Sequence, residues 1–356
     1  MSGGDGPGPF VYEALPVRVA FGPGRRRELA SEMQRLGVSK ALLIAGEHER
    51  ETADEAARTL GPGVAGRWPE VRQHVPVELV DRARAEAARA GADALVCIGG
   101  GSAIGLAKAI ALSLSVPIPI VALPTTYSGS EMTPIWGTTA QGHKTTGRDA
   151  RVLPSAVIYD PELTTTLPVR LSATTGVNAL AHCAEALYAA GANPVTSLVA
   201  LEGARALFAS LPLVTARPTD VGARSTALYG AFLAGRALAG AGTSVHHKVC
   251  HVLGGRYDLP HAELHTAVLA HSLALVEAQR PELLAPLAAA TGAASAATGV
   301  AELIRGLIGS ASVGDLGVTL DQLRAAVPDV LATGAGRPWA NTEDEVTAFM
   351  ESLLYA

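Results

Sequence analysis

Four histidines and one asparagine stand at spacings that could build one polar site. His247 and His251 are four residues apart in the stretch HHKVCHVLGGRYDLPH, which His261 closes. His182 follows Asn178 by four residues in GVNALAH. Residues at positions i and i+4 share one face of a helix, so each pair is expected to point the same way. Three imidazoles suit zinc or ferrous iron, but an asparagine amide is a much weaker ligand than a carboxylate.

Three cationic residues add charge to this set. Lys248 lies between His247 and His251, and Lys144 and Arg148 lie in GHKTTGRD. A lysine and an arginine together can hold a carboxylate group of a substrate. The alternative for Lys144 and Arg148 is an exposed surface loop, and for a lone histidine it is an ordinary hydrogen-bonded residue. The paired spacings favour a shared pocket over these alternatives.

Two polar turns follow buried strands and predict a cofactor site. The first, IGGGS, lies between a strand and a helix, where glycines let a phosphate approach the unpaired N–H groups of the helix N-terminus. It does not match GxGxxG, and a turn without a ligand is the alternative. The second, LPTTYSGSEM, offers hydroxyls for ribose, phosphate or amide groups. The predicted cofactor-binding residues are Gly99, Gly100, Gly101, Ser102, Thr125, Thr126 and Ser128. In GEHERE, Glu47 or Glu49 could meet a ribose hydroxyl and disfavour NADP.

Alternating strand and helix signals must position these residues. An α/β domain with a parallel, doubly wound sheet is predicted for residues 1–163, and an all-helical domain for residues 164–356. A small-residue loop is predicted over residues 288–299. The expected strands are 17–22, 40–46, 93–102 and 117–126, with one more in 152–168, and the expected helices of the first domain are 26–37, 77–92 and 102–114.

Composition narrows the classes of function. The chain has 356 residues, 48% of them hydrophobic and 17% charged, with a net charge of −5 and no dense basic cluster. A nucleic-acid or membrane partner is therefore not expected. No apolar run reaches the ~20 residues of a membrane span. The three cysteines are far apart in sequence, which favours a reducing compartment. A soluble cytoplasmic protein is predicted.

Taken together, the motifs resemble the iron-containing (group III) alcohol dehydrogenase superfamily, with its dehydroquinate synthase-like fold. The superfamily pattern is GGGS, a PTT loop, Asp-x3-His, His-x3-His and Pro-His. Within it, the chain is most similar to maleylacetate reductases. Asn178 replaces the ligand aspartate, Gly105 stands where the metal-dependent dehydrogenases have aspartate, and PTTYSGSE is shorter than the usual PTTAGTGSE.

This resemblance implies a reductase that works without a tightly bound metal. NADH or NADPH would reduce the conjugated C=C bond of maleylacetate, a small dicarboxylate enone, to 3-oxoadipate in the degradation of aromatic compounds. The resemblance also implies a homodimer. His251 and His247 are expected to deliver a proton or stabilise an oxyanion, with Lys248 as electrostatic support. The pocket would be shaped by His182, His261 and Asn178, and the carboxylates held by Lys144 and Arg148.

Three other interpretations stay open at this point. A metal-dependent alcohol or aldehyde dehydrogenase would keep iron or zinc on the histidines, with water in place of the aspartate. A related reductase could act on another unsaturated keto acid in secondary metabolism. A non-catalytic nucleotide-binding or structural protein would bind the cofactor without turnover.

Overall fold

The computed structural model describes residues 8–141, 143–334, 339 and 342–355, so the first part of the glycine-rich N-terminus lies outside the described residues. The strands are β1 (Arg18–Phe21), β2 (Ala41–Ala45), β3 (Val64–Trp68), β4 (Ala94–Gly99), β5 (Ile120–Pro124), β6 (Ile135–Ala140), β7 (His143–Arg148) and β8 (Ala156–Tyr159). The α-helices are α1 (Leu29–Arg35), α2 (Arg50–Leu60), α3 (Val77–Arg89), α4 (Gly101–Ser113), α5 (Val169–Glu185), α6 (Pro194–Ala216), α7 (Val221–Ala241), α8 (Val245–Tyr257), α9 (His261–Gln279), α10 (Pro281–Thr291), α11 (Ala296–Ile308), α12 (Leu320–Ala332) and α13 (Glu343–Ser352).

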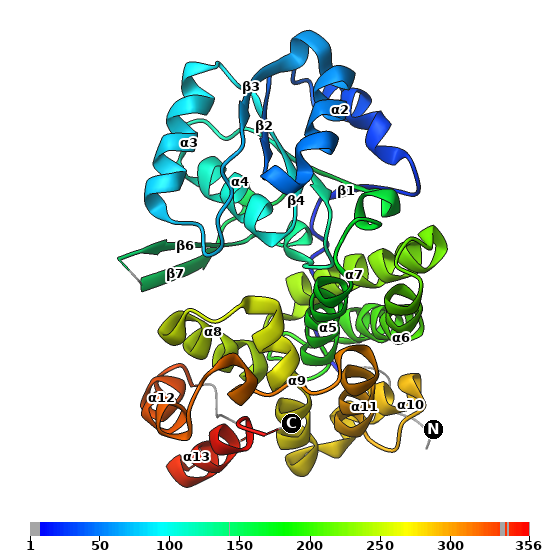
Figure 1. Ribbon diagram of the computed structural model, residues 1–356, viewed down its shortest axis with the longest axis vertical. Coiled ribbons are helices and arrows are strands. Elements are labelled where there is room, and N and C mark those ends of the chain that lie inside the picture. Colours follow the sequence, from blue (N-terminus) through cyan, green and yellow to red (C-terminus); the bar gives the residue numbers. More distant parts are fainter. Residues whose placement is uncertain (1–7, 142, 335–338, 340–341, 356) are drawn as a thin grey trace.

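A six-stranded parallel sheet forms the first layer of the molecule, in the order β1-β8-β5-β4-β2-β3. Its central strands are apolar along their whole length and completely buried, as in ALLIA of β2 and ALVCIG of β4. Such strands need cover on both faces. Helices α3 and α4 pack on one face, and α1 and α2 on the other (Figure 1). The predicted doubly wound α/β fold is confirmed.

The order of the strands locates the ligand-binding edge of the sheet. From β2 the chain crosses to β3 at one edge, whereas from the adjacent β4 it crosses to β5 on the other side. Loops that leave neighbouring strands in opposite directions open a crevice at the carboxyl ends of those strands. The loop after β2 and the glycine turn after β4 therefore meet at this edge.

Lys108 on α4 fixes the polar loop after β5. It is fully buried, and its Nζ donates to the carbonyl oxygens of Ser130, Thr133 and Ile135 at 2.6, 2.8 and 2.8 Å. Burial lowers the pKa of Lys108 to about 7, while the nearby Glu131 carboxylate opposes this shift. Only the ammonium form has three N–H donors for three carbonyls, so the geometry favours the charged form.

An antiparallel hairpin, β6–β7, leaves the sheet after this loop and was not expected from the sequence. It carries residues 143–149 out over the helical half, near α8 (Figure 1). Arg148 at the end of β7 donates to the carbonyl of Ala239 in α7 at 2.9 Å. This bond ties the hairpin to the helices.

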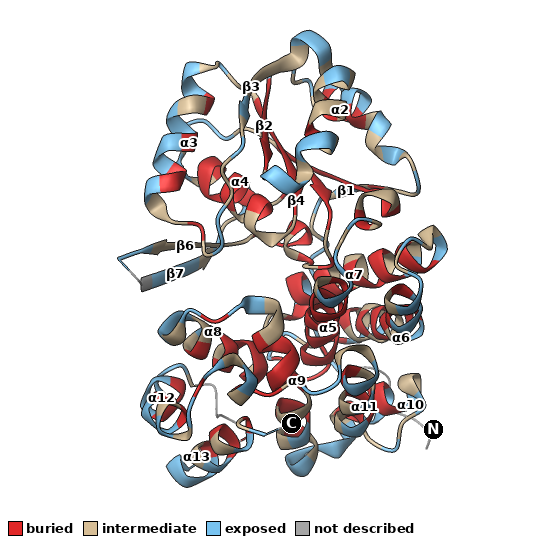
Figure 2. Cartoon of the chain, in the orientation of Figure 1, coloured by how far each residue is buried: buried red, intermediate tan, exposed pale blue. Residues whose placement is uncertain are grey.

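The second half is helical, as predicted, and α5 runs through its centre. Every residue of α5 from Ser172 to Glu185 is buried (Figure 2). Helix α6 is long and apolar enough, by length and composition, to cross a membrane. Its buried face packs against α5 and α7, which is the packing of a core helix. The division between residues 163 and 164, which falls in the turn between β8 and α5, remains our proposed domain boundary.

Three sequence-based expectations need correction or completion. The region 288–299 is mostly helical, because α10 extends to Thr291 and α11 begins at Ala296. The alanines and glycines of this stretch show no hydrophobic periodicity, which is why a helix was not predicted. Both helices nevertheless bury leucine or isoleucine side chains elsewhere along their length, and this packing holds them in place. The elements α2 and β3 were also missed, since VAGRW lacks the apolar run of a central strand. The stretch 26–37 begins with a 3₁₀ turn before α1.

The three cysteines are free and buried in different layers of the structure. Cys97 lies in β4, Cys183 in α5 and Cys250 in α8. Burial raises the pKa of Cys97 to about 12 and raises the pKa of the other two thiols as well.

Candidate active site

A buried carboxylate orients the first histidine of the site. His247 on α8 places its Nδ1 2.5 Å from Oε2 of Glu185 on α5, and its backbone N–H donates to Oε1 at 3.3 Å. Both side chains are buried. The carboxylate accepts the proton on Nδ1, so the neutral ring carries an unprotonated Nε2 on its far side. This Nε2 has no partner among the described residues.

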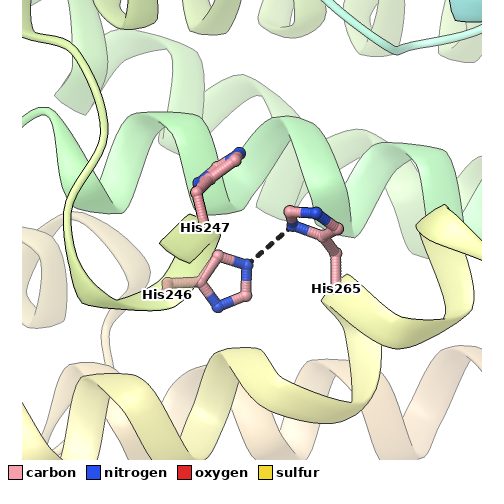
Figure 3. Close-up of side chains that lie close together, drawn as sticks. All are labelled: His246, His247 and His265. Atoms are coloured by element: carbon pink, nitrogen blue, oxygen red, sulfur yellow. Dashed lines mark hydrogen bonds between the residues drawn. The ribbon is translucent and has the colours of Figure 1, made fainter. Parts of the chain in front are cut away.

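A chain of three side chains orients a second ring in the same way. Ser272 on α9 has two carbonyl acceptors in its own helix, Leu269 O at 2.9 Å and Val268 O at 3.2 Å. Its hydroxyl proton is used there, so its oxygen accepts from Nδ1 of His246 at 3.1 Å. Nε2 of His246 then accepts from Nδ1 of His265 at 2.9 Å (Figure 3).

The consequence of this chain is a second unprotonated Nε2, on His265. It is buried and has no partner among the described residues. The rings of His247 and His265 lie with their centroids 4.6 Å apart. Because the chain ends at a buried serine, it fixes the orientation of His265 and offers no path for protons to solvent.

Asn178 and His182 on α5 are buried beside His247. The His182 ring stacks on His247 at a centroid distance of 4.8 Å. Burial lowers the pKa of His182 well below its usual value, and the neighbouring His247 lowers it further. Nδ1 of His182 and Oδ1 of Asn178 are both buried without a partner in the described chain. The site therefore presents several buried polar atoms that can bind water or a bound molecule.

His251 and His261 form the outer part of the site. Both residues are exposed, and the His247 and His251 centroids lie 6.0 Å apart. The surrounding protein, although it leaves solvent access, lowers the pKa of both rings, and the charge of Lys144 contributes to each shift. Lys144 on β7 thus stands within electrostatic reach of the histidines, although it is far from them in sequence. Lys248 is half-buried on α8.

The family resemblance raises the question of whether these histidines could hold a metal ion. The ring nitrogens of His246, His247 and His265 lie within 4.8 Å of one another (Figure 3). However, Nε2 of His246 is already bonded to His265, and the Glu185 carboxylate is bonded to His247. His246 is therefore not available as a ligand. A metal ion held by the other histidines would have the neutral Asn178 where the resemblance expects an aspartate, so no carboxylate ligand would balance its charge and it would be bound more weakly.

The predicted cofactor turns lie against each other at the edge of the sheet. Gly99 has φ +145°, and Thr125 N donates to its carbonyl at 3.2 Å. A Cβ on Gly100 would meet the Thr126 side chain at 2.8 Å. Helix α4 begins at Gly101 without a side-chain cap, so its first N–H groups are free to bind a phosphate. The turn has the shape of a pyrophosphate cradle.

The loop after β5 joins this cradle to the histidines. Ser128 lies over Gly101, 3.6 Å from where a Cβ on that glycine would stand. A Cβ on Gly129 would lie 3.3 Å from Nδ1 of His182 and 3.1 Å from Gly235 in α7. One short loop therefore contacts both the glycine turn after β4 and the histidine cluster.

Of the two carboxylates considered for the ribose, Glu49 is the one at the cradle. Oε1 of Glu49 accepts from Thr125 at 3.3 Å, and its carboxyl carbon is 3.8 Å from the position of a Cβ on Gly99. Burial raises the pKa of Glu49. Glu47 instead is exposed and pairs with Arg50 at 2.6 Å.

Comparison with known proteins agrees with this geometry. A family model for iron-containing alcohol dehydrogenase matches residues 16–161, and the model for the C-terminal part of that family matches residues 172–354. The chain belongs to the iron-containing alcohol dehydrogenase family. Membership makes it an oxidoreductase, as predicted.

Its relatives include several maleylacetate reductases. The chain is 46% identical to the maleylacetate reductase of Sphingobium indicum, with 97% of each chain covered. It is 48% identical to that of a Rhizobium species, over 98% of this chain and 97% of the relative. The crystal structure of maleylacetate reductase from Agrobacterium tumefaciens is 44% identical and superposes with a TM-score of 0.92, over 97% of this chain and 98% of that one. The predicted resemblance is confirmed.

Three functional residues were missed by the sequence reasoning. The spacing of His246 and His265 could have revealed them. His265 follows His261 by four residues on one helix, and His246 precedes His247 directly. Glu185 follows His182 by three residues and faces the same way. The predicted roles of the site residues, including Arg148 as a substrate clamp, stay predictions.

Proposed function

We propose that this protein reduces the conjugated C=C bond of maleylacetate to give 3-oxoadipate, with NADH or NADPH as the hydride donor. The observation that carries the proposal is the similarity to maleylacetate reductases along nearly the whole chain. The structure adds support, since one loop contacts both the glycine turn that would bind the cofactor and the histidine cluster.

The electronic structure of this substrate explains how the reaction proceeds without a Lewis acid. Its alkene is conjugated to a ketone, so hydride addition at the far alkene carbon moves the electron pair onto the ketone oxygen as an enolate. Bound NADH supplies that hydride. Positive charge and hydrogen-bond donors aimed at the enolate then lower the barrier. Lys144 stands near the histidines and can supply this charge.

Protonation of the enolate carbon completes the reaction, and we assign it to His247. Its Nε2 faces the pocket, and Glu185 behind it stabilises the positive charge of the ring when both nitrogens carry protons. His251, exposed at the outer edge of the site, can pass a proton from solvent to this position. His182, His261 and Asn178 shape the pocket around the substrate.

For the cofactor we propose a preference for NADH over NADPH. The Glu49 carboxylate beside Gly99 can accept from a ribose hydroxyl, and it would repel a 2′-phosphate. We also propose a cytoplasmic homodimer. The free, buried cysteines support a reducing compartment, and the exposed apolar residues Phe10 and Val11 support a second copy as partner. Light scattering would test the dimer.

The decisive experiment follows NADH oxidation with freshly generated maleylacetate, in the presence and absence of EDTA. The proposal expects turnover to 3-oxoadipate in both conditions. Turnover that is lost to EDTA and restored by ferrous iron or zinc would make the protein a metalloenzyme instead. If NADH binds but maleylacetate is not reduced, a panel of related unsaturated keto acids becomes the next set of substrates, and this substrate assignment is wrong.

A further inference from the structure

The segment between β3 and α3 contains two residues with strained backbone conformations. His74 and Val75 have φ of +60° and +48°, in the left-handed region that side chains rarely adopt. Val75 is β-branched, which makes this conformation especially unfavourable. Strain of this kind persists only where the surroundings impose it. Asp258, another non-glycine residue with positive φ, lies next to the same segment.

The hairpin holds the segment from one side. Thr139 of β6 donates its backbone N–H to the carbonyl of Val75 at 3.1 Å and its hydroxyl to the carbonyl of His74 at 2.8 Å. Pro76 forms an isolated bridge with the same threonine. The segment and the hairpin that carries Lys144 are therefore one unit.

Helix α4 packs against the other side of the segment, and Gly105 on this helix leaves room for Val75. Val75 is buried, and its Cγ2 lies 3.1 Å from where a Cβ on Gly105 would stand. A larger residue at position 105 would push Val75 away.

The strained backbone places His74 at the edge of the active site. Its Nε2 lies 3.6 Å from Oδ1 of Asp258, just after the helix that carries His247. Lys144 is paired across the hairpin with Thr139, the residue that binds the carbonyls of His74 and Val75, so His74 and Lys144 lie on neighbouring stretches of backbone. His74 is half-buried, and Asp258 is almost fully exposed, so the aspartate can turn away when a ligand enters.

We propose that His74 binds the substrate: together with Lys144 it holds one carboxylate of the dicarboxylate enone, and Gly105, Val75 and Thr139 are the residues that position it. This proposal rests on the proposed function for the identity of the substrate. An imidazole N–H and an ammonium group can both donate to one carboxylate. The strain at His74 is then the cost of bringing a donor from the sheet domain to a site built mainly on helices.

The test compares the steady-state constants of His74→Ala, His74→Gln and the wild type. Loss of one hydrogen bond to a charged group predicts an increase of about tenfold or more in KM for maleylacetate in His74→Ala. The KM for NADH and the kcat should stay within about twofold. His74→Gln keeps an N–H donor and should recover part of the affinity. Unchanged KM for maleylacetate in His74→Ala would overturn the proposal.

Two further variants separate substrate binding from a structural role. Asp258→Asn removes the other partner of His74 and should leave the KM for maleylacetate unchanged; an increase equal to that of His74→Ala would mean that His74 only links the two halves. Gly105→Ala should raise the same KM by displacing Val75, and combining it with His74→Ala should add little. Thr139→Val offers the same test if Gly105→Ala does not fold.

The outcome for His74 stays separate from that of the proposed function. Wild-type turnover of maleylacetate tests the function by itself. Binding of the product, 3-oxoadipate, measured by calorimetry in the wild type and in His74→Ala, tests the carboxylate contact without turnover. Equal affinity of the two proteins for 3-oxoadipate would count against His74 even if the wild type is an active reductase.

Discussion

Replacing Glu185 by glutamine tests how the protein controls the proton on His247. The carboxylate uses one oxygen for Nδ1 of the ring and the other for the backbone N–H of the same residue. Glutamine has one oxygen and one NH₂ group, so one of these two bonds must be lost. If the NH₂ group faces the ring, Nδ1 has to give up its proton, and the proton moves to the pocket side.

The size of the effect follows from the bond that is removed. A hydrogen bond to a charged group contributes about 1.5–3 kcal/mol. If that energy is needed to hold the protonated ring in the transition state, kcat falls about tenfold to a hundredfold. The KM for NADH should change little, because the two hydrogen bonds that the Glu185 side chain makes within the described residues both go to His247, and neither goes to the cofactor turns. The assay is steady-state oxidation of NADH with saturating maleylacetate.

A matched control is Glu32→Gln. Glu32 is another buried carboxylate, and it pairs with Arg18 at 2.7 Å in the sheet domain. This variant should show a similar change in melting temperature and the kcat of the wild type. If Glu185→Gln keeps a wild-type kcat, or if both variants lose activity in proportion to their loss of stability, then Glu185 has no role in proton transfer and the reasoning is wrong.

Four further predictions follow from the site. As the pH is lowered from about 6.5, the free energy of unfolding should decrease by up to about 1.4 kcal/mol per pH unit for each buried histidine with a lowered pKa. The reason is that the unfolded chain binds protons that the folded chain excludes. Urea unfolding measured over a series of acidic pH values checks this prediction. Gly100→Ala should weaken NADH binding in a fluorescence titration, because its Cβ would meet Thr126 at 2.8 Å. Glu49→Gln should narrow the preference for NADH over NADPH, measured as a ratio of kcat/KM values. Asn178→Asp should increase zinc retained after dialysis, measured by elemental analysis, whereas the wild type should retain little.

Each of these predictions has an outcome that would contradict it. Constant unfolding free energy between pH 7 and about pH 5 would mean that the buried rings can be protonated without cost. Unchanged NADH affinity in Gly100→Ala would place the cofactor away from the cradle. An unaltered cofactor ratio in Glu49→Gln would remove Glu49 from the ribose site. Equal zinc content in Asn178→Asp and the wild type would show that the missing carboxylate is not what limits metal binding.

The nucleotide half of the site could be predicted because its signals are local. Gly99 to Ser102 follow a buried strand directly, and the polar loop after β5 follows the next one, so the carboxyl ends of adjacent parallel strands bring them together. The β6–β7 hairpin could not be predicted in this way. Its sequence has few apolar residues. It is stabilised by hydrogen bonds to α7 and to Val75, and contacts between residues so distant in sequence cannot be predicted from a local pattern.

The histidine pocket was predicted in part for a similar reason. The i, i+4 spacing placed Asn178 with His182 and His247 with His251. That Glu185 binds His247 depends on how α5 packs against α8, and that His265 faces the same space depends on α9. Contacts between helices that are distant in sequence are set by the packing of the whole helical half, so a pattern within one helix does not contain them.

The three buried thiols can report local opening of three different parts of the fold. Each cysteine is almost inaccessible to solvent, and burial raises the pKa of every one, so the reactive thiolate is scarce in the native state. A thiol reagent can modify a cysteine only when its own layer opens. Since Cys97 sits in the sheet, Cys183 in the central helix and Cys250 beside the histidines, the order in which they are labelled reports which layer of the enzyme loosens first.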